Sequence, residues 1–312
     1  MKKVLAIRPV KLPVAVGSIV LAAALIAAAF VFRPGTSAPA AAAPATTPAA
    51  HRSRFPVPPR GAVVFSRQMG GEALALGVVA QGGHVLLQAS VVGPQGTGVA
   101  GLDVSLNGKR ASACGPGCYR ATAAGRPARV EVRVRSTRWR VSLPAVWPPR
   151  DASALLVRAG RAWRSLHSLS FREQLASDRV HTTTSAWRIE APGSVAYQVE
   201  GGWAGIVVGN RRWDRSPASK GWVASPQAPL TQPVPAWVRV ADAHVLGTTI
   251  LNGRQAWRIS FFDPSIPAWF TLAIDRKTFR TLDSRMTATA HFMHDTYRSF
   301  NATPAIRPPI HP

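Results

Sequence analysis

Strict alternation of apolar and polar residues is the feature that most constrains the fold of this 312-residue chain. In "RVEVRV", Val130, Val132 and Val134 are separated by charged residues, and similar segments recur through most of the chain. Because successive side chains of a β-strand point to opposite faces, a period of two predicts half-buried strands. Pairs such as Asn107-Gly108 and Asn252-Gly253 separate the strands and are strong hairpin signals. The sequence therefore predicts a mainly β protein built from antiparallel sheets.

The alternating segments form two regions with an amphipathic helix between them. Residues 61–147 carry short strands with turn signals and predict a small β-sandwich of immunoglobulin-like type. Two prolines end this region, and apolar residues then follow helical spacing within residues 151–169. The second region, residues 151–311, is predicted to be this helix followed by a large antiparallel sheet. Its Pro-rich segment 225–240 predicts a covering loop with a short helical turn.

The N-terminal residues predict a membrane anchor. Residues 12–32 are uncharged and apolar, and about 20 such residues span a bilayer. Basic residues in segment 1–11 place the N-terminus in the cytoplasm, so we expect a single-pass protein of the cytoplasmic membrane with extracytoplasmic folded domains. A cleaved signal peptide is the alternative, although its apolar region is usually only about 7–15 residues. The Pro- and Ala-rich residues 33–60 predict a semi-extended linker.

The net charge is +24, with 38 basic against 14 acidic residues. Nucleic acid is the usual partner of so basic a chain. The predicted extracytoplasmic location argues against nucleic acid. It favours an anionic membrane surface or a cell-wall polymer as the partner of the basic surface.

The chain has two cysteines, Cys114 and Cys118, in "CGPGC". Outside the cytoplasm such thiols usually oxidise, and the intervening Gly-Pro-Gly allows a tight turn. We therefore predict a small structural disulfide that fixes a turn between two strands of the sandwich. A redox pair or a thiolate metal site is the alternative, and the metal site would need further ligands.

The segment "MTATAHFMHDTY" contains two histidines and a methionine within four residues, which raises the question of a copper site. Alternation over residues 282–294 predicts one continuous strand. In a strand, His291 and His294 point to opposite faces, while His291 and Met293 share a face and make an incomplete metal site. We therefore predict no metal site here, and copper binding by His291, Met293 and His294 remains the alternative.

Catalytic motifs are not recognisable in the sequence. The 14 carboxylates suggest no spaced acid pair, and there is no nucleophile elbow, phosphate-binding Gly loop or zinc-protease motif. We expect a protein that is not an enzyme and that needs no cofactor.

Aromatic residues are concentrated in the second region, where seven of the ten tryptophans lie between residues 150 and 260. An ordinary core would explain them. A pocket between helix and sheet is the alternative, because Ala288 and Ala290 beside Phe292 leave room among large side chains. Such an apolar pocket would suit an acyl chain, and Trp163 of the helix is predicted to be one of its lining residues.

The second region resembles the bacterial lipoprotein-carrier (LolA-like) fold over about residues 152–311. The resemblance rests on the helix followed by "WRIEAPGSVAYQV", "GNRRWDRS", "GRQAWRISFFDP", "WFTLAIDRKT" and "RMTATAHFMHDTY". That fold is a half-barrel whose concave face holds lipid under helical lids. The resemblance implies that these residues line or back the cavity: Trp187, Ile189, Trp257, Ile259, Phe261, Phe270, Leu272 and Ile274. The predicted anchor and sandwich are departures from the carriers.

The same segments, with "CGPGCYRA" upstream, also resemble the extracytoplasmic tails of actinobacterial copper-resistance membrane proteins. Three functions are therefore carried forward. The leading one is binding of a lipid acyl chain or a lipoprotein in the half-barrel. The alternatives are a copper-handling accessory protein of the cell envelope and a protein-binding scaffold without a small-molecule site.

Overall fold

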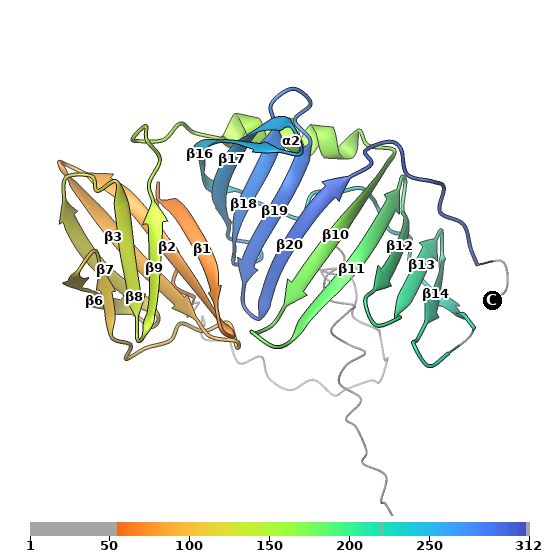
Figure 1. The fold of residues 1–312 in the computed structure, drawn as a ribbon, viewed down its shortest axis with the longest axis horizontal. Helices are drawn as coiled ribbons and strands as arrows, with labels where there is room; N and C mark the ends of the chain where they lie inside the picture. The colour runs from red at the N-terminus through yellow and green to blue at the C-terminus, as the bar shows by residue number, and fades with distance from the viewer. Residues whose placement is uncertain (1–54, 220, 310–312) are drawn as a thin grey trace, which may run out of the picture. The chain divides into compact units, whose positions relative to one another are not determined.

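The computed structural model describes residues 55–219 and 221–309. The predicted basic segment, anchor and most of the predicted linker lie outside these residues. Within them, one helix and twenty strands form three antiparallel sheets, so the prediction of a mainly β protein is confirmed (Figure 1). No helix in this part of the chain is long and apolar enough to cross a membrane.

Residues 63–142 form two antiparallel sheets that share one apolar core. The first has the order β1-β2-β3-β7-β6 and the second β5-β4-β8-β9. Their bounds are β1 Val63–Met69, β2 Glu72–Gln81, β3 His84–Val92, β4 Val104–Leu106, β5 Lys109–Arg110, β6 Ser112–Gly115, β7 Cys118–Ala124, β8 Arg129–Val134 and β9 Thr137–Ser142.

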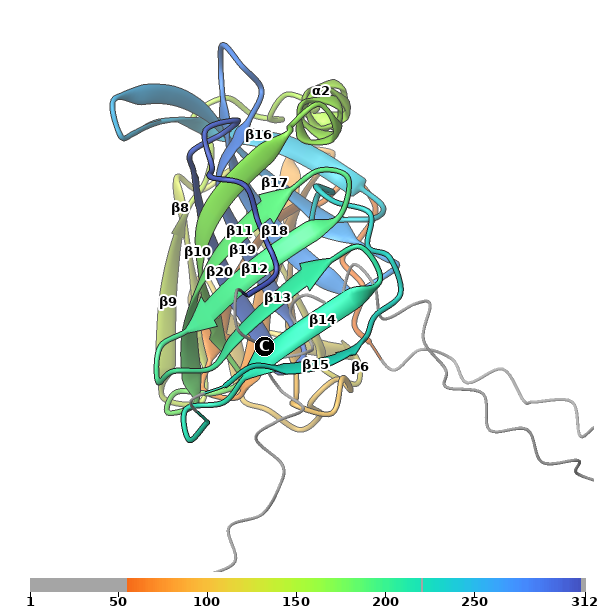
Figure 2. The same ribbon diagram turned by 90° about the vertical axis from the view of Figure 1, so that its right-hand side faces the viewer.

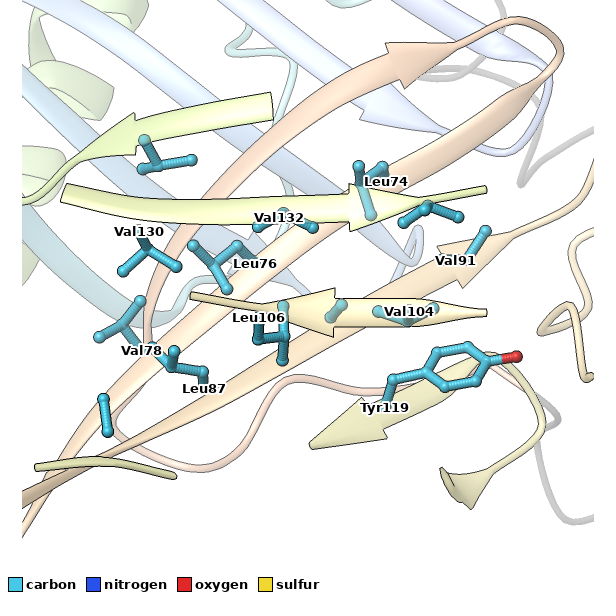
Figure 3. Packing of buried hydrophobic residues seen from close by; sticks show 14 of the residues in the cluster. Leu74, Leu76, Val78, Leu87, Val91, Val104, Leu106, Tyr119, Val130 and Val132 are labelled. Atoms are coloured by element: carbon cyan, nitrogen blue, oxygen red, sulfur yellow. The ribbon is translucent and has the colours of Figure 1, made fainter. Parts of the chain in front are cut away.

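The shared core comes from the alternating positions that the sequence marks as apolar. Val130 and Val132 of β8 are completely buried and lie near Leu76 of β2 and Leu106 of β4 (Figure 3). Burial of each such side chain contributes about 1.5–3 kcal/mol. The observed two-sheet arrangement occupies the predicted range, and its immunoglobulin-like type stays a prediction.

The predicted disulfide is confirmed. Cys114 of β6 and Cys118 of β7 are joined with an S–S distance of 1.95 Å. The turn between them requires glycine at Gly117, which has φ +68°, since a Cβ there would lie 2.3 Å from the Val91 carbonyl oxygen. The amide of Val91 donates to the Gly117 carbonyl at 2.8 Å, which fixes the turn against β3.

The second region is one helix and one eleven-stranded antiparallel sheet. The strand order is β15-β14-β13-β12-β11-β10-β20-β19-β18-β17-β16, so the first strand after the helix, β10, pairs with the last, β20. The bounds are β10 Ser168–Ala176, β11 Thr182–Glu190, β12 Ser194–Val199, β13 Ala204–Val208, β14 Arg211–Arg215, β15 Val223–Pro226, β16 Ala241–Leu251, β17 Arg254–Asp263, β18 Ala268–Asp275, β19 Thr281–Ala288 and β20 His291–Arg298.

Helix α2 (Ser153–Arg164) lies at one end of this sheet (Figure 2). Its buried side includes Leu156, Ala159 and Trp163, and its arginines face solvent, as the helical spacing predicts. The indole Nε1 of Trp163 donates to Thr281 Oγ1 at 3.0 Å, which joins the helix to β19. The helix is shorter than predicted because β10 begins at residue 168.

The predicted single strand over residues 282–294 is wrong. β19 ends at Ala288 and β20 begins at His291, with Ala290 in the connecting turn at φ +52°. Met286 therefore faces Met293 across the hairpin. In this hairpin, each even-numbered residue of β19 pairs with an odd-numbered residue of β20. Even positions of β19 and odd positions of β20 therefore lie on the same face of the sheet. The turn has no Gly or Asn that would mark it in the sequence.

This pairing puts Phe292 on the face opposite the other predicted lining residues. It packs with Phe262 and Trp269 of the same sheet and with Val64 of β1. Ser66 of β1 also donates to Thr287 Oγ1 at 3.0 Å. We call this face of the eleven-stranded sheet the outer face, and the one in contact with α2 the inner face. The assignment of Phe292 to the lining is therefore wrong.

Candidate ligand-binding face

Strands β17 and β18 supply the most apolar part of the inner face. Ile259 and Phe261 of β17 lie directly opposite Leu272 and Phe270 of β18, and all four are at most 1% exposed. The rings of Phe261 and Phe270 stack with centroids 5.0 Å apart. The next pair, Trp257 with Ile274, completes the six residues that the sequence placed on these strands.

An aromatic row crosses four further strands of the sheet, beyond β19. Tyr297, Phe171, Trp187 and Tyr197 are successive partners in the register of β20, β10, β11 and β12. Their ring centroids are 5.3, 5.8 and 4.8 Å apart in that order. Trp163 of α2 meets Tyr297 edge-on at 5.1 Å. We call these four sheet residues the aromatic row.

The row ends at Gly205 of β13, which faces Tyr197. A Cβ at Gly205 would lie 2.3 Å from Tyr197 Cε1, so a side chain at this position would displace the tyrosine ring. The Tyr197 hydroxyl accepts from Arg212 at 3.0 Å, and Arg212 also pairs with Asp214 at 2.7 Å. The aromatic row thus has a charged pair at one end.

A polar row lies beside the aromatic row on the same face. Ser284, Asp295, Glu173 and Ser185 are directly opposite one another across β19, β20, β10 and β11. All four are buried, with exposures of 1–5%. We call these four residues the polar row. It contains two carboxyl groups on adjacent strands, beside the aromatic row.

Hydrogen bonds connect the two rows. The Tyr297 hydroxyl donates to Asp295 Oδ2 at 2.7 Å. Trp187 Nε1 donates to Ser185 Oγ at 2.7 Å, and that hydroxyl donates to Glu173 Oε1 at 3.4 Å. The aromatic side chains therefore position the carboxyl groups as well as supplying apolar surface.

Burial keeps these carboxyl groups protonated to unusually high pH. Loss of water raises the pKa of Glu173 from 4.5 to about 7, against the opposing effect of its hydrogen bonds. Burial, and then the charge of Glu173, raises the pKa of Asp295 well above 3.8. Two adjacent carboxylates in a low-dielectric site cannot both ionise easily, so the pair retains a proton near neutral pH.

Part of the polar row lacks hydrogen-bond partners. Among the residues described, Asp295 Oδ1 has none. The Ser284 hydroxyl lies near that of Tyr297 but makes no hydrogen bond of good geometry. A buried polar atom left in this state costs about 1–3 kcal/mol.

A loop over residues 227–240 reaches across the inner face from one side to the other. Trp237 of the loop contacts Phe261 edge-on at 6.0 Å. The amides of Val238 and Arg239 donate to Asp263 Oδ2 at 2.7 and 2.9 Å. The predicted covering loop is thus observed, but its predicted helical turn is absent from residues 227–240.

The other end of the loop is held at the turn between β11 and β12. Gln232 N donates to the Pro192 carbonyl at 3.0 Å. At Gly193 the backbones approach so closely that a Cβ would lie 2.0 Å from the Leu230 carbonyl oxygen. Only glycine permits this closure, since any side chain would push the loop away from the sheet.

The remaining predicted lining residues divide between different places. Trp187, Ile189 and Ala288 lie on the inner face, and Ala290 is in the hairpin turn. One cavity of about 980 Å³ runs along the outer face toward the sandwich, and another of about 280 Å³ lies near Phe300. Tyr297, at one end of the aromatic row, borders the smaller cavity.

The structure separates the three candidate copper ligands. His294 Nε2 donates to Asp283 Oδ2 at 2.6 Å on the outer face. His291 and Met293 share the inner face, where Met286 lies opposite Met293. Both cysteines are in the disulfide, and the described residues contain no group of three His, Cys, Asp or Glu placed to hold a metal.

Sequence reasoning missed the carboxyl pair. Glu173 and Asp295 are distant in the chain and meet only because the sheet joins β10 to β20. With one continuous strand, the odd positions from Asp283 to Asp295 would also form a single polar face, an arrangement that the turn before His291 rules out. The local signal was the pattern Phe171, Glu173, Leu175, where a carboxylate replaces an expected apolar residue.

Comparisons with known proteins give matches among solved structures alone: no family model and no curated protein matches the chain. The lipoprotein LppX of Mycobacterium tuberculosis is 14% identical, with a TM-score of 0.40 over 49% of this chain and 97% of LppX. LprF of Mycobacterium bovis is 12% identical, with a TM-score of 0.37 over 51% and 96% of the two chains. A LolA superfamily protein of Nitrosomonas europaea is 8% identical, with a TM-score of 0.25 over 50% and 95%. These matches include a LolA superfamily protein, the family that residues 152–311 were predicted to resemble, and with TM-scores of at most 0.40 they carry no conclusion about function.

Proposed function

We propose that this chain is a non-enzymatic, membrane-anchored protein of the cell envelope that binds the acyl chain of a lipid or lipoprotein on the inner face. The observation that carries the proposal is the aromatic row, which lies on the same face as the apolar surface of β17 and β18 and is separated from it by β19. Among the described residues, helix α2 and the loop that carries Trp237 contact this face, where a core would usually have a second sheet.

The energy gained by burying an acyl chain is of the same order as the cost of opening the loop. At least four hydrogen bonds hold the loop, of which the two to the Asp263 carboxylate contribute about 1.5–3 kcal/mol each and the two to backbone carbonyls about 0.5–1.5 kcal/mol each. Burial of Trp237 adds roughly 3 kcal/mol. An acyl chain of about 14 methylenes gains on the order of 11 kcal/mol on burial at about 0.8 kcal/mol each.

The basic surface supports the same role. Arg158, Arg161 and Arg164 form the exposed side of α2, next to the closed end of the inner face. Such a side attracts anionic head groups with about 1 kcal/mol per residue near a membrane surface. The predicted anchor would hold this helix close to the membrane that supplies the ligand.

The loop gives a direct test with a matched control. Cells that produce the full chain are fed a fatty acid carrying a diazirine and an alkyne, then irradiated, and label per protein is measured after click chemistry. Gly193→Ala forces the loop outward and is expected to increase labelling several-fold. Gly221→Ala is the control, because an added Cβ meets nothing within 4 Å there.

The probe also labels the predicted anchor. This background is the same in the wild type, Gly193→Ala and Gly221→Ala, so it does not affect the comparison. Equal labelling of wild type, Gly193→Ala and Gly221→Ala would mean that acyl chains do not enter beneath the loop. The protein-binding scaffold would then be the better account, since the inner face would be an ordinary closed core.

One observation favours copper as a second candidate function. Met286 lies opposite Met293 on the face that His291 shares, so three soft or borderline ligands are on neighbouring positions. His291 Nδ1 lies 3.1 Å from the Thr289 carbonyl, and an N–H there would leave Nε2 free to bind metal.

Titration with Cu(I) under anaerobic conditions tests this candidate. The wild type is expected to bind one ion, and the double change Met286→Leu and Met293→Leu is expected to abolish binding. Met69→Leu in the sandwich is the control. Failure of the wild-type chain to bind Cu(I) would exclude the candidate.

A further inference from the structure

We infer that the polar row is a head-group site, and that it selects an amphiphile with a primary ammonium group over one with a carboxylate. This inference rests on the proposed binding of an acyl chain at the inner face. It assigns the chemistry of the ligand's polar end, which the apolar surface alone does not specify.

Position is the first argument. The polar row crosses four strands in register and borders the aromatic row on the three strands that they share, β20, β10 and β11. A chain lying on the aromatic row therefore has its polar end within reach of Asp295 and Glu173. The hydrogen bonds from Tyr297 and Trp187 hold the polar row in place from the aromatic side.

Unused hydrogen-bonding capacity is the second argument, and Asp263 provides an internal comparison. Asp263 is completely buried, and its carboxylate accepts four hydrogen bonds, from the amides of Val238, Arg239 and Ser265 and from the Ser265 hydroxyl. A structural carboxylate in this fold therefore has hydrogen-bond donors for both of its oxygens. Asp295 is 2% exposed, yet one of its oxygens has no partner among the described residues.

Charge is the third argument. No described basic residue forms an ion pair with Glu173 or Asp295, and the nearby His294 and Asp283 act from the outer face. The pair retains one negative charge once its first proton is lost. An ammonium group supplies three donors and a compensating charge, whereas a carboxylate supplies no donor and is repelled.

Two probes with the same chain test the inference in cells that produce the full-length protein. One is a sphingoid base bearing a diazirine and an alkyne, and the other is the matching fatty acid. Cross-linked peptides of β10, β11 and β20 are quantified by mass spectrometry. In the wild type we expect at least tenfold more cross-linking by the amine than by the acid.

Asp295→Asn is expected to reduce this ratio below threefold, and Glu173→Gln supplies the same test should the first variant fold poorly. Asp178→Asn, in the turn between β10 and β11, is the control and keeps the wild-type ratio. Equal cross-linking by both probes in the wild type overturns the inference while leaving the proposed function intact. A ratio unchanged in both variants overturns it as well. Absence of inner-face cross-links with either probe defeats the proposed function itself.

Discussion

Removal of the Glu173 carboxyl should change how stability depends on pH. A buried acid whose pKa is raised stays protonated in the folded protein after it has ionised in the unfolded chain. Its contribution is therefore fully present below pH 4.5 and is lost as pH rises through about 7. We predict that the free energy of unfolding of the wild type falls with pH across this window.

The magnitude follows from the two pKa values. A raise from 4.5 to about 7, at 1.36 kcal/mol per pH unit, corresponds to about 3 kcal/mol. Glu173 is only 5% exposed, so solvent screening reduces this little. The side chain of the Glu173→Gln variant cannot ionise. The free energy of unfolding of this variant minus that of the wild type should therefore be about 2–3 kcal/mol larger at pH 8 than at pH 5.

Urea unfolding of the full chain at pH 5, 6, 7 and 8 measures this difference. Glu200→Gln, at an exposed position, is the control and should follow the wild type. Burial lowers the pKa of His244, and this effect makes the free energy of unfolding rise with pH. His244 is present in every variant, so its contribution cancels when the variants are compared. A Glu173→Gln protein that retains the full pH dependence of the wild type would refute the buried acid pair.

Two further changes test the packing. Gly205→Ala should displace Tyr197, whose ring carbon would lie 2.3 Å from the new Cβ, and should lower the free energy of unfolding by about 1–3 kcal/mol in urea; unaltered stability would show that the end of the aromatic row is loosely packed. Replacement of Cys114 and Cys118 by Ser should lower the melting temperature only modestly, because the enclosed loop is far shorter than the 15 residues that give about 3 kcal/mol. Two reactive thiols in wild-type protein isolated without reductant would contradict the disulfide.

Local chemistry made most of the fold predictable. Asn107-Gly108 and Asn252-Gly253 adopt the positive φ angles that their hairpins need, and the turns are where the sequence placed them. Strict alternation in β8 likewise identified its buried valines. These features depend on neighbouring residues, so one sequence suffices to recognise them.

The candidate site depends on contacts between residues that are far apart in the sequence. Pairing of β10 with β20 brings Glu173 to Asp295 across the whole length of the meander, and no spacing in the sequence encodes that contact. The turn at residues 289–290 lacks the usual glycine or asparagine, so alternation was extended through it. That one missed turn put Phe292 on the wrong face and grouped Asp295 with the polar odd positions of β19.

The position of cross-links on the wild-type chain tests the central claim most directly. After irradiation with the diazirine fatty acid or sphingoid base, modified residues are located by peptide mass spectrometry. The account predicts cross-links on peptides that contain Phe171, Trp187 and Tyr197, and on the loop that carries Trp237. Cross-links confined to residues 12–32, with none on the inner face, would contradict it.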